Sequence, residues 1–370
     1  MRRIIAVPAV LVACALPGPT RAATTPTWCL PPVFEGGERL HALPVPSAFW
    51  LPPLLRQHQL CHAATEHPDE PRAILIGNSA VLGFPLPVEA TLGARLNASL
   101  RDHGVRGRVF NLGWVNAYQL RDAVILNAAL EYRPDVIIYP LTLADFHHVA
   151  PVLFGPTPAF FDTNATQVLE MVHIGVPGLD APLQRYEAAF LKRGRLDGYW
   201  QHWQEVGALA RAAAHANATT LARLLDPTLP PEMVSPGHPK TTYDCTEVIL
   251  RRRGYRRWQS WNILAYLQAL HERDGIQVLV ANWPMDHKPI GECYNARHAA
   301  ADVDEFNRWL REECAARGLE YVDLHDLLSS AEFFDSIHPT AEGHQRIAEH
   351  LAPAVEEALR ARAAARSALR

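Results

Sequence analysis

The chain has 370 residues, 48% of them hydrophobic, and a formal net charge of −4. This length allows one large domain or two ordinary ones, and the apolar fraction is sufficient for a substantial core. The slightly acidic balance gives no electrostatic reason to expect nucleic-acid binding, so we expect no nucleic acid among the partners of the protein.

Residues 1–22 are predicted to be a signal peptide. Positive charges at Arg2 and Arg3 precede an apolar run from Ile4 to Leu16, and the small residue Ala22 ends a suitable cleavage site. The apolar run is too short to span a bilayer comfortably, which favours export followed by cleavage. We therefore expect an exported protein, either periplasmic or extracellular.

The same leader contains a second signal. Residues 11–14 (Leu-Val-Ala-Cys) have the form of a bacterial lipobox, in which a lipid on Cys14 would anchor the mature protein to a membrane. The long segment at residues 17–22 favours ordinary cleavage over lipidation. Membrane contact is expected only if the protein is a lipoprotein anchored through Cys14.

Residues 23–71 are rich in proline, with Pro-Pro pairs at 31–32 and 52–53, and predict an irregular N-terminal arm wrapped on the domain. From Arg72 onward, short apolar runs alternate with amphipathic stretches. The runs predict strands at Ala73–Ile76, Arg108–Leu112, Asp135–Leu141, Ile276–Ala281 and Glu320–Leu324. The stretches predict helices at Val88–Asp102, Leu120–Tyr132, Gln259–Arg273, Ala299–Arg317 and Ala341–Ala363.

Short apolar strands that alternate with helices indicate a parallel sheet covered on both faces. We therefore predict a doubly wound α/β domain over residues 72–370. The alternation is interrupted at about residues 147–258, a stretch longer than any ordinary connection. We interpret it as a helical insertion that caps the carboxyl ends of the strands, where the active sites of such sheets lie.

Five cysteines follow the leader, and none forms a metal-binding C-x-x-C pair. In an oxidising compartment Cys29–Cys61 and Cys245–Cys293 are reasonable disulfides, with Cys314 left over inside a helix, although connectivity does not follow from sequence. The histidines show no metal-ligand spacing such as H-E-x-x-H, so we expect neither a metal site nor a cofactor.

Two distant segments carry the residues for chemistry. Asp335 precedes His338 by three residues in a loop before a predicted helix, so its carboxylate can orient one imidazole nitrogen and leave the other as a base. Ser79 follows the first predicted strand, in the turn Gly77-Asn78-Ser79. A serine hydroxyl needs an adjacent base to attack an ester. The two segments together predict acyl chemistry.

The chain resembles the SGNH (GDSL-type) hydrolase family over roughly residues 72–146 and 260–355. The first sequence block of that family matches at residues 77–79, with Asn78 in place of the usual aspartate. The second block matches Asn-Leu-Gly at 111–113, and the last matches Asp-x-x-His-Pro at 335–339. In the third block only the final aspartate, Asp145, survives.

The resemblance implies a flavodoxin-like sheet of the SGNH-hydrolase type, with Ser79 as nucleophile, His338 as base and Asp335 as its orienting acid. It also implies that the backbone N–H groups of Ser79 and Gly113 form the oxyanion hole. We note that Gly113 could equally serve the backbone alone, and that Asp145 could contact the loop that carries the serine or be purely structural.

One oxyanion donor of the family is missing, because Ala144 stands where an asparagine is usual. Losing one such donor typically costs about 100- to 1000-fold in kcat. A nearby side chain could replace it, the enzyme could be slow or specialised, or the site could have become a binding surface. The candidate auxiliary donors are Asn111, Asn116 and Thr142.

We therefore expect an exported serine esterase that acts on a small-molecule or glycan ester through an acyl-enzyme. One alternative is an O-acyltransferase or deacetylase of envelope polysaccharide, which would use the same acyl-enzyme. The other is a catalytically silent envelope or carbohydrate-binding protein on the same fold. The residues of the insertion do not distinguish these three functions.

Overall fold

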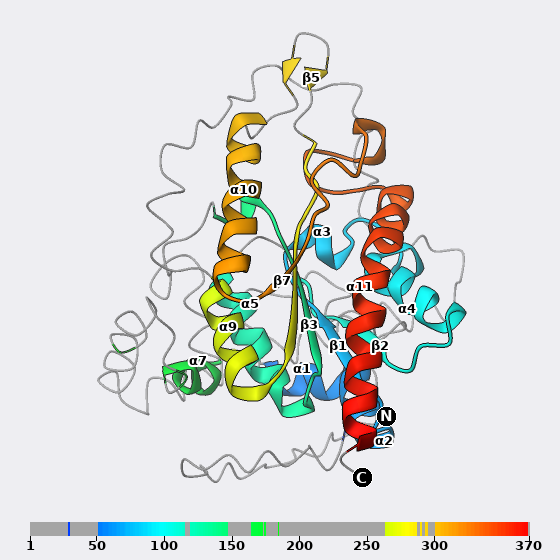
Figure 1. Ribbon diagram of the computed structural model, residues 1–370, viewed down its shortest axis with the longest axis vertical. Coiled ribbons are helices and arrows are strands. Elements are labelled where there is room, and N and C mark those ends of the chain that lie inside the picture. Colours follow the sequence, from blue (N-terminus) through cyan, green and yellow to red (C-terminus); the bar gives the residue numbers. More distant parts are fainter. Residues whose placement is uncertain are drawn as a thin grey trace, which may run out of the picture.

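The computed structural model describes residues 29, 51–114, 119–146, 164–172, 174, 184, 263–286, 289–290, 293–294 and 300–368. At its centre lies a sheet of five parallel strands in the order β2-β1-β3-β4-β7 (Figure 1). The strands are β1 (Arg72–Leu75), β2 (Arg108–Asn111), β3 (Val136–Leu141), β4 (Gln277–Asn282) and β7 (Glu320–Val322). The five predicted strands are confirmed, with small shifts at their ends.

Both faces of this sheet are buried, which explains the continuous apolar runs in the sequence. In β1, Ile74 packs into one hydrophobic core and the next residue, Leu75, packs into the other. Ile137 and Ile138 in β3 are divided between the two cores in the same way. Because successive side chains of a strand point to opposite faces, each face of such a strand needs its own cover.

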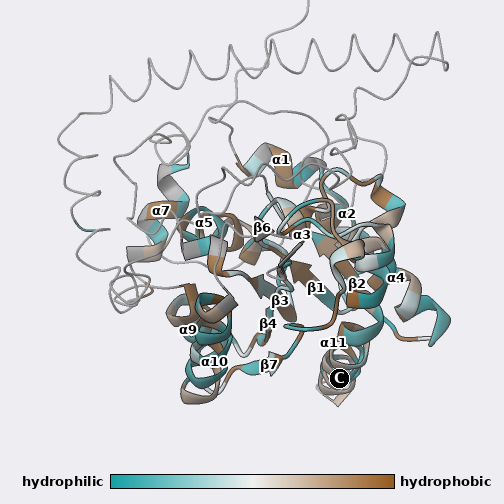
Figure 2. Cartoon of the chain, turned by 90° about the horizontal axis from the view of Figure 1, so that it is seen from above, coloured by the Kyte–Doolittle hydropathy of each residue, from teal (hydrophilic) through white to brown (hydrophobic). Residues whose placement is uncertain are grey.

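Helices provide that cover on both faces. One layer contains α4 (Leu92–Asp102) and α11 (Ala341–Ala368), and the other contains α5 (Gln119–Ala129), α9 (Ile263–Asp274) and α10 (Ala300–Ala316). Figure 2 shows the two layers on either side of the strands. The strand order is that of flavodoxin-like doubly wound sheets. The predicted fold class is therefore confirmed.

Shorter elements connect these layers. They are α1 (Leu51–Gln57), α2 (Gln59–Glu66), α3 (Ser79–Leu82), α7 (Ala165–Val172), the 3-10 helices η1 (Val88–Ala90), η2 (Leu130–Tyr132), η3 (Leu143–Phe146) and η6 (Ser330–Glu332), and the paired strands β5 (Pro289–Ile290) and β6 (Cys293–Tyr294). Across the described parts of the chain, no helix combines the length and the apolar character that a membrane crossing requires.

Residues 51–66 differ from the expected irregular arm, because they form the helices α1 and α2. Pro52 and Pro53 lie in the first turn of α1, where a missing backbone N–H breaks no helical hydrogen bond. Leu51 and Leu55 are buried and anchor α1 on the core. The leader and the remainder of the arm lie outside the described residues, apart from Cys29.

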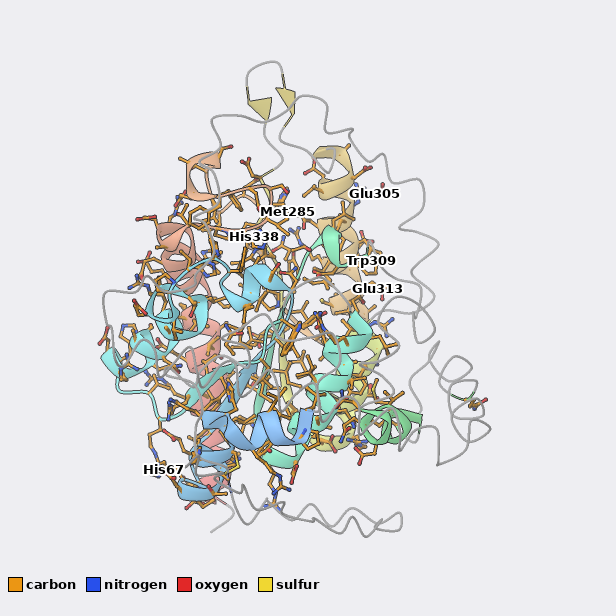
Figure 3. All side chains as sticks on the ribbon, turned by 180° about the vertical axis from the view of Figure 1, so that it is seen from behind. His67, Met285, Glu305, Trp309, Glu313 and His338 are labelled. Atoms are coloured by element: carbon orange, nitrogen blue, oxygen red, sulfur yellow. A yellow bond between two sulfur atoms is a disulfide. The ribbon has the colours of Figure 1, made fainter. Side chains whose placement is uncertain are left out.

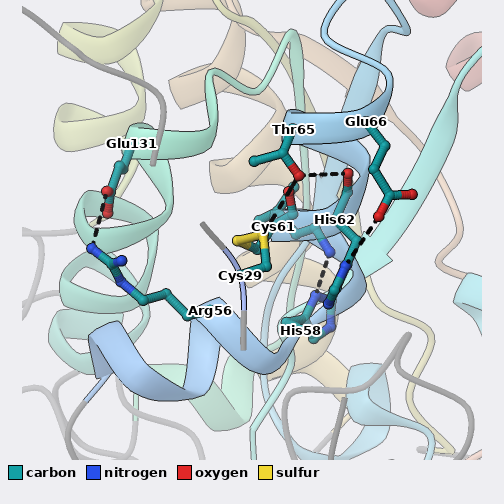
Figure 4. Close-up of a disulfide and its surroundings, with 9 residues drawn as sticks. Cys29, Arg56, His58, Cys61, His62, Thr65, Glu66 and Glu131 are labelled. Atoms are coloured by element: carbon teal, nitrogen blue, oxygen red, sulfur yellow. Dashed lines mark hydrogen bonds and ion pairs between the residues drawn. A yellow bond between two sulfur atoms is a disulfide. The ribbon is translucent and has the colours of Figure 1, made fainter. Parts of the chain in front are cut away.

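A disulfide joins Cys29 to Cys61 in α2, as predicted (Figure 4). It fastens the proline-rich segment to the folded domain. Cys314 is free and buried in α10, which was also predicted. The second expected pair cannot be assessed in the same way, because Cys245 lies outside the described residues.

The insertion at 147–258 is described only at residues 164–172, 174 and 184. Its helix α7 packs against α5, where Asn127 Nδ2 donates to Glu170 Oε2 at 2.8 Å. Asn164 Oδ1 accepts a 2.8 Å bond from the backbone N–H of Leu51, the first residue of α1. This part of the insertion thus belongs to the core on one face of the sheet. The expected cap over the strand ends otherwise falls outside the described residues.

Candidate active site

Ser79 lies just beyond the carboxyl end of β1, as the first residue of the short helix α3. Asn78 caps this helix, because its Oδ1 accepts a 2.9 Å hydrogen bond from the N–H of Ala80. The preceding glycine allows the turn to close tightly, since a Cβ at Gly77 would lie 2.8 Å from Val81 Cγ2. The strand-to-helix turn therefore fixes the serine at the edge of the sheet.

His338 reaches this serine from the other end of the chain. Its Nε2 lies 2.8 Å from Ser79 Oγ, and its Nδ1 lies 2.7 Å from Asp335 Oδ2. The figure of all side chains places His338 at the opposite end of the molecule from His67, which precedes β1 (Figure 3). The three residues that the sequence singled out thus form one hydrogen-bonded chain at the carboxyl ends of the strands.

The loop around His338 is held in place by its own hydrogen bonds. Asp335 Oδ1 accepts from the backbone N–H groups of Ile337 and His338, both at 2.8 Å. Trp283 Nε1, at the end of β4, donates to the carbonyl of Ile337 at 2.9 Å. These contacts fix the loop to the sheet and aim the imidazole at Ser79.

The carboxyl of Asp335 favours its ionised form. Burial by itself opposes ionisation, but hydrogen bonds from His338 and from the backbone, together with the charge of that imidazole, hold the pKa of Asp335 below its ordinary value. An ionised carboxylate beside Nδ1 favours the tautomer in which Nδ1 carries the proton. Nε2 is then an acceptor that can take the proton of Ser79.

The two backbone N–H groups expected to bind the oxyanion differ in whether they already have an acceptor. Among the described residues, nothing accepts the backbone N–H of Ser79, which can therefore serve an oxyanion. The N–H of Gly113 donates instead to Asn111 Oδ1 at 2.9 Å. In this arrangement the N–H of Gly113 bonds within its own loop, and its role in the oxyanion hole stays a prediction.

Gly113 has a packing reason to be glycine. A Cβ at this position would lie 2.7 Å from the backbone nitrogen of Leu82 in α3. The loop after β2 can approach the helix that carries Ser79 only because no side chain intervenes. The structure thus gives Gly113 a packing role, and its role as an oxyanion donor stays a prediction.

Two of the three candidate auxiliary donors form hydrogen bonds within the fold. Asn111 is buried, and its Nδ2 donates to the carbonyl of Val81 at 3.0 Å. Thr142 is fully buried, and its hydroxyl donates to Asp145 Oδ2 at 2.8 Å. The Thr142 side chain has therefore used its single donor, whereas Asn111 Nδ2 carries a second N–H, and the role of either side chain as an oxyanion donor stays a prediction. The third candidate, Asn116, lies outside the described residues.

Asp145 contacts the loop that carries the serine. Asn78 Nδ2 donates to Asp145 Oδ1 at 3.0 Å, so one asparagine caps α3 with its oxygen and binds the buried acid with its nitrogen. Burial raises the pKa of Asp145, while hydrogen bonds from Thr142 and Asn78 favour its ionised form. From the sequence, this contact was one of two roles considered for Asp145.

A second buried acid, Asp122, was not anticipated from the sequence. Asp122 in α5 accepts from the hydroxyl of Tyr139 in β3 at 3.1 Å and from Arg121 at 3.2 Å. Burial raises the pKa of Asp122 from 3.8 to about 6, and the neighbouring Asp145 adds to the shift while Arg121 opposes it. The only signal for this group was an acidic residue in a helix whose residues are all buried, and that burial is not visible in the sequence.

The arrangement has the chemistry that acyl transfer requires: a hydroxyl, an imidazole in contact with it and a carboxylate that orients the imidazole. In the part of the chain that the structure describes, no group of three or more His, Cys, Asp or Glu side chains is arranged to hold a metal ion.

A comparison with protein families identifies a match. The model described as "GDSL-like Lipase/Acylhydrolase family" matches residues 75–346. This range includes Ser79, Asp335 and His338, and it spans the insertion. A search of curated proteins finds no match.

Solved structures similar to this chain include three esterases or lipases by description. A protein described as an arylesterase from Agrobacterium tumefaciens is 14% identical, with 78% of this chain and 99% of that chain covered and a TM-score of 0.36. A carbohydrate acetylesterase family member from Sinorhizobium meliloti is 11% identical, with 78% and 99% covered and a TM-score of 0.35. A lipase from Streptomyces rimosus is 12% identical, with 78% and 99% covered and a TM-score of 0.32.

Proposed function

Because the chain belongs to the GDSL-like lipase/acylhydrolase family, we propose that it hydrolyses an ester through Ser79, His338 and Asp335. The observation that carries this proposal is the continuous pair of contacts, 2.8 Å from Ser79 Oγ to His338 Nε2 and 2.7 Å from His338 Nδ1 to Asp335. Both distances allow direct proton transfer without movement of the backbone.

In the first half of the reaction, Ser79 Oγ attacks the ester carbonyl while its proton passes to His338 Nε2. The tetrahedral intermediate then collapses, the bond to the alcohol oxygen breaks, and His338 returns the proton to that oxygen. Asp335 stabilises the imidazolium between these two events. In the second half, water attacks the acyl-enzyme with His338 as base, which releases the acid and restores Ser79.

The oxyanion would be stabilised by the N–H of Ser79 and by a second donor. Asn116 is our candidate for this second donor, because the other residues considered, Gly113, Asn111 and Thr142, already bond within the fold. Without an asparagine at position 144, we expect a lower kcat than a site with all donors would give, by about 100- to 1000-fold if nothing replaces it.

We further propose that the protein is exported and acts on a small-molecule or glycan ester. The disulfide between Cys29 and Cys61 supports an oxidising compartment, either periplasmic or extracellular. The leader supports the same location, with a membrane anchor only if Cys14 is lipidated. Mass spectrometry of the mature N-terminus tests this point, and a start at Ala23 or Thr24 without lipid would exclude the anchor.

The catalytic proposal is tested by hydrolysis of p-nitrophenyl acetate. We expect Ser79→Ala to reduce the rate to the background reaction and to prevent labelling by a fluorophosphonate probe. Ser367→Ala is a matched control in the last turns of α11, remote from the site, and should leave both readouts unchanged. Equal hydrolysis by the wild type and Ser79→Ala would refute the proposal and favour a silent binding protein.

A further inference from the structure

Phe84 is an apolar side chain beside the candidate active site. It is 37% exposed, and among the described residues no other large apolar side chain is exposed to this extent. Its ring lies edge-on to the imidazole of His338, with ring centroids 5.8 Å apart and an angle of 62° between the planes. Single exposed apolar side chains are common on protein surfaces, but this one lies against His338, where a bound ester would meet it.

The backbone fixes this phenylalanine relative to the nucleophile. The N–H of Phe84 donates to the carbonyl of Ser79 at 3.0 Å, directly after α3. The following turn is closed by the N–H of Leu86, which donates to the carbonyl of Gly83 at 2.7 Å. These bonds fix the backbone of Phe84 beside Ser79, and the ring contact places its side chain against His338.

The chemistry of the triad determines which part of an ester would meet this ring. His338 Nε2 must return a proton to the departing alcohol oxygen, so the alcohol portion has to lie beside the imidazole. The acyl portion is bonded through its carbonyl carbon to Ser79 Oγ. The exposed apolar surface that borders the imidazole is the ring of Phe84.

We propose that Phe84 is a specificity-determining residue that binds the apolar or aromatic alcohol portion of the ester. This inference rests on the proposed function and adds a preference for one side of the scissile bond. When the bond between the acyl carbon and the alcohol oxygen breaks, the alcohol leaves with the proton from His338. When water then attacks the acyl-enzyme, no part of the substrate contacts Phe84.

The test compares two esters that share one acyl group, phenyl acetate and ethyl acetate, in the wild type, Phe84→Ala and Phe84→Leu. We expect Phe84→Ala to lower kcat/KM for phenyl acetate about fivefold to thirtyfold more than for ethyl acetate, because an apolar ring contact is lost. Phe84→Leu keeps apolar area and should lose less. Each variant serves as its own control, because the ratio between two esters is unaffected by a loss of folded protein.

Two further measurements locate the effect. The rate at which water resolves the acetyl-enzyme should be equal in the wild type and Phe84→Ala. A series of phenyl esters with acetyl, butyryl and hexanoyl groups should show the same relative rates in both proteins. A uniform loss for both acetates, or an effect that follows acyl length, would overturn the assignment. Absence of any Ser79-dependent hydrolysis in the wild type would instead refute the proposed function itself, and the inference with it.

Discussion

At the scale of single residues, Asn78 connects the nucleophile to a buried acid. Its oxygen caps α3 and its nitrogen donates to Asp145, so both ends of one amide are used. An aspartate at this position could still cap the helix, but it could not donate to Asp145. The asparagine is therefore matched to its partner, which gives a physical reason for the departure from the usual first block of the family.

We predict that Asn78→Asp will destabilise the protein by about 1–3 kcal/mol, because two carboxylates would then meet in a buried contact without a donor between them. Ser79-dependent hydrolysis should fall as well. The double variant Asn78→Asp/Asp145→Asn exchanges donor and acceptor and should recover most of both losses. Denaturant unfolding and ester hydrolysis are measured for the wild type, Asn78→Asp, Asp145→Asn and the double variant, and a double variant no better than Asn78→Asp would contradict the pairing.

The three central residues of the site were predictable from sequence, because the spacing of Asp335 and His338 and the strand before Ser79 are local patterns. The partner of a backbone N–H does not follow from a sequence motif, even when that partner lies two residues away. Gly113 was expected to face the oxyanion, yet the side chain of Asn111 folds back onto its N–H. Phe84 was missed for a different reason, because its contact with His338 joins segments that are far apart in the chain.

At the scale of elements, α5 is attached to β3 by a buried polar contact, between Asp122 and Tyr139. The pKa of Asp122 is raised from 3.8 to about 6 in the folded protein by burial. Between these two pH values the folded state binds more protons than the unfolded state, so the contribution of Asp122 to stability falls as pH rises. Above about pH 6 the full cost of a buried charge applies.

We predict that the free energy of unfolding of the wild type, minus that of Asp122→Asn, will decrease by on the order of 2–3 kcal/mol from about pH 4 to about pH 7. Asparagine does not titrate, and the remaining groups are common to both proteins, so the difference isolates Asp122. Denaturant unfolding at several pH values measures it. A difference that stays constant or grows with pH would show that the pKa of Asp122 is not raised in the folded protein.

The regular elements were the most predictable part of the molecule. The strands β1, β2, β3 and β4 are largely buried on both faces, and their continuous apolar runs follow directly from that burial, whereas the edge strand β7 is partly exposed. The helices α1 and α2 were missed, because the pair Pro52-Pro53 indicates irregular structure unless it falls in the first turn of a helix. The position of this pair within a helix depends on where the buried Leu51 and Leu55 pack. That packing cannot be predicted from the local sequence.

At the scale of the whole molecule, the disulfide between Cys29 and Cys61 connects residues 32 positions apart. Closing a loop of this size in the unfolded chain corresponds to about 3–4 kcal/mol of stability. We predict that Cys29→Ala/Cys61→Ala will lower the free energy of unfolding by about that amount, and that a reductant will lower it by about that amount more in the wild type than in the variant. Denaturant unfolding with and without dithiothreitol measures this.

The outcome of the reductant experiment also bears on the part of the chain that lies outside the described residues. If the reductant destabilised Cys29→Ala/Cys61→Ala as much as the wild type, the effect would come from another disulfide. The pair Cys245–Cys293 is the one that the sequence predicts. The connectivity of such pairs could not be predicted with the same security as the sheet, because it depends on how distant segments pack.

The contact between Ser79 and His338 joins residues 259 positions apart. The nucleophile is therefore synthesised with the first strand, whereas its base belongs to the last loop before the terminal helix. A growing or truncated chain that ends before residue 335 carries the serine without anything to activate it. Reactivity of Ser79 toward a covalent probe accordingly reports that the final helix has docked, and could be used to time the last step of folding.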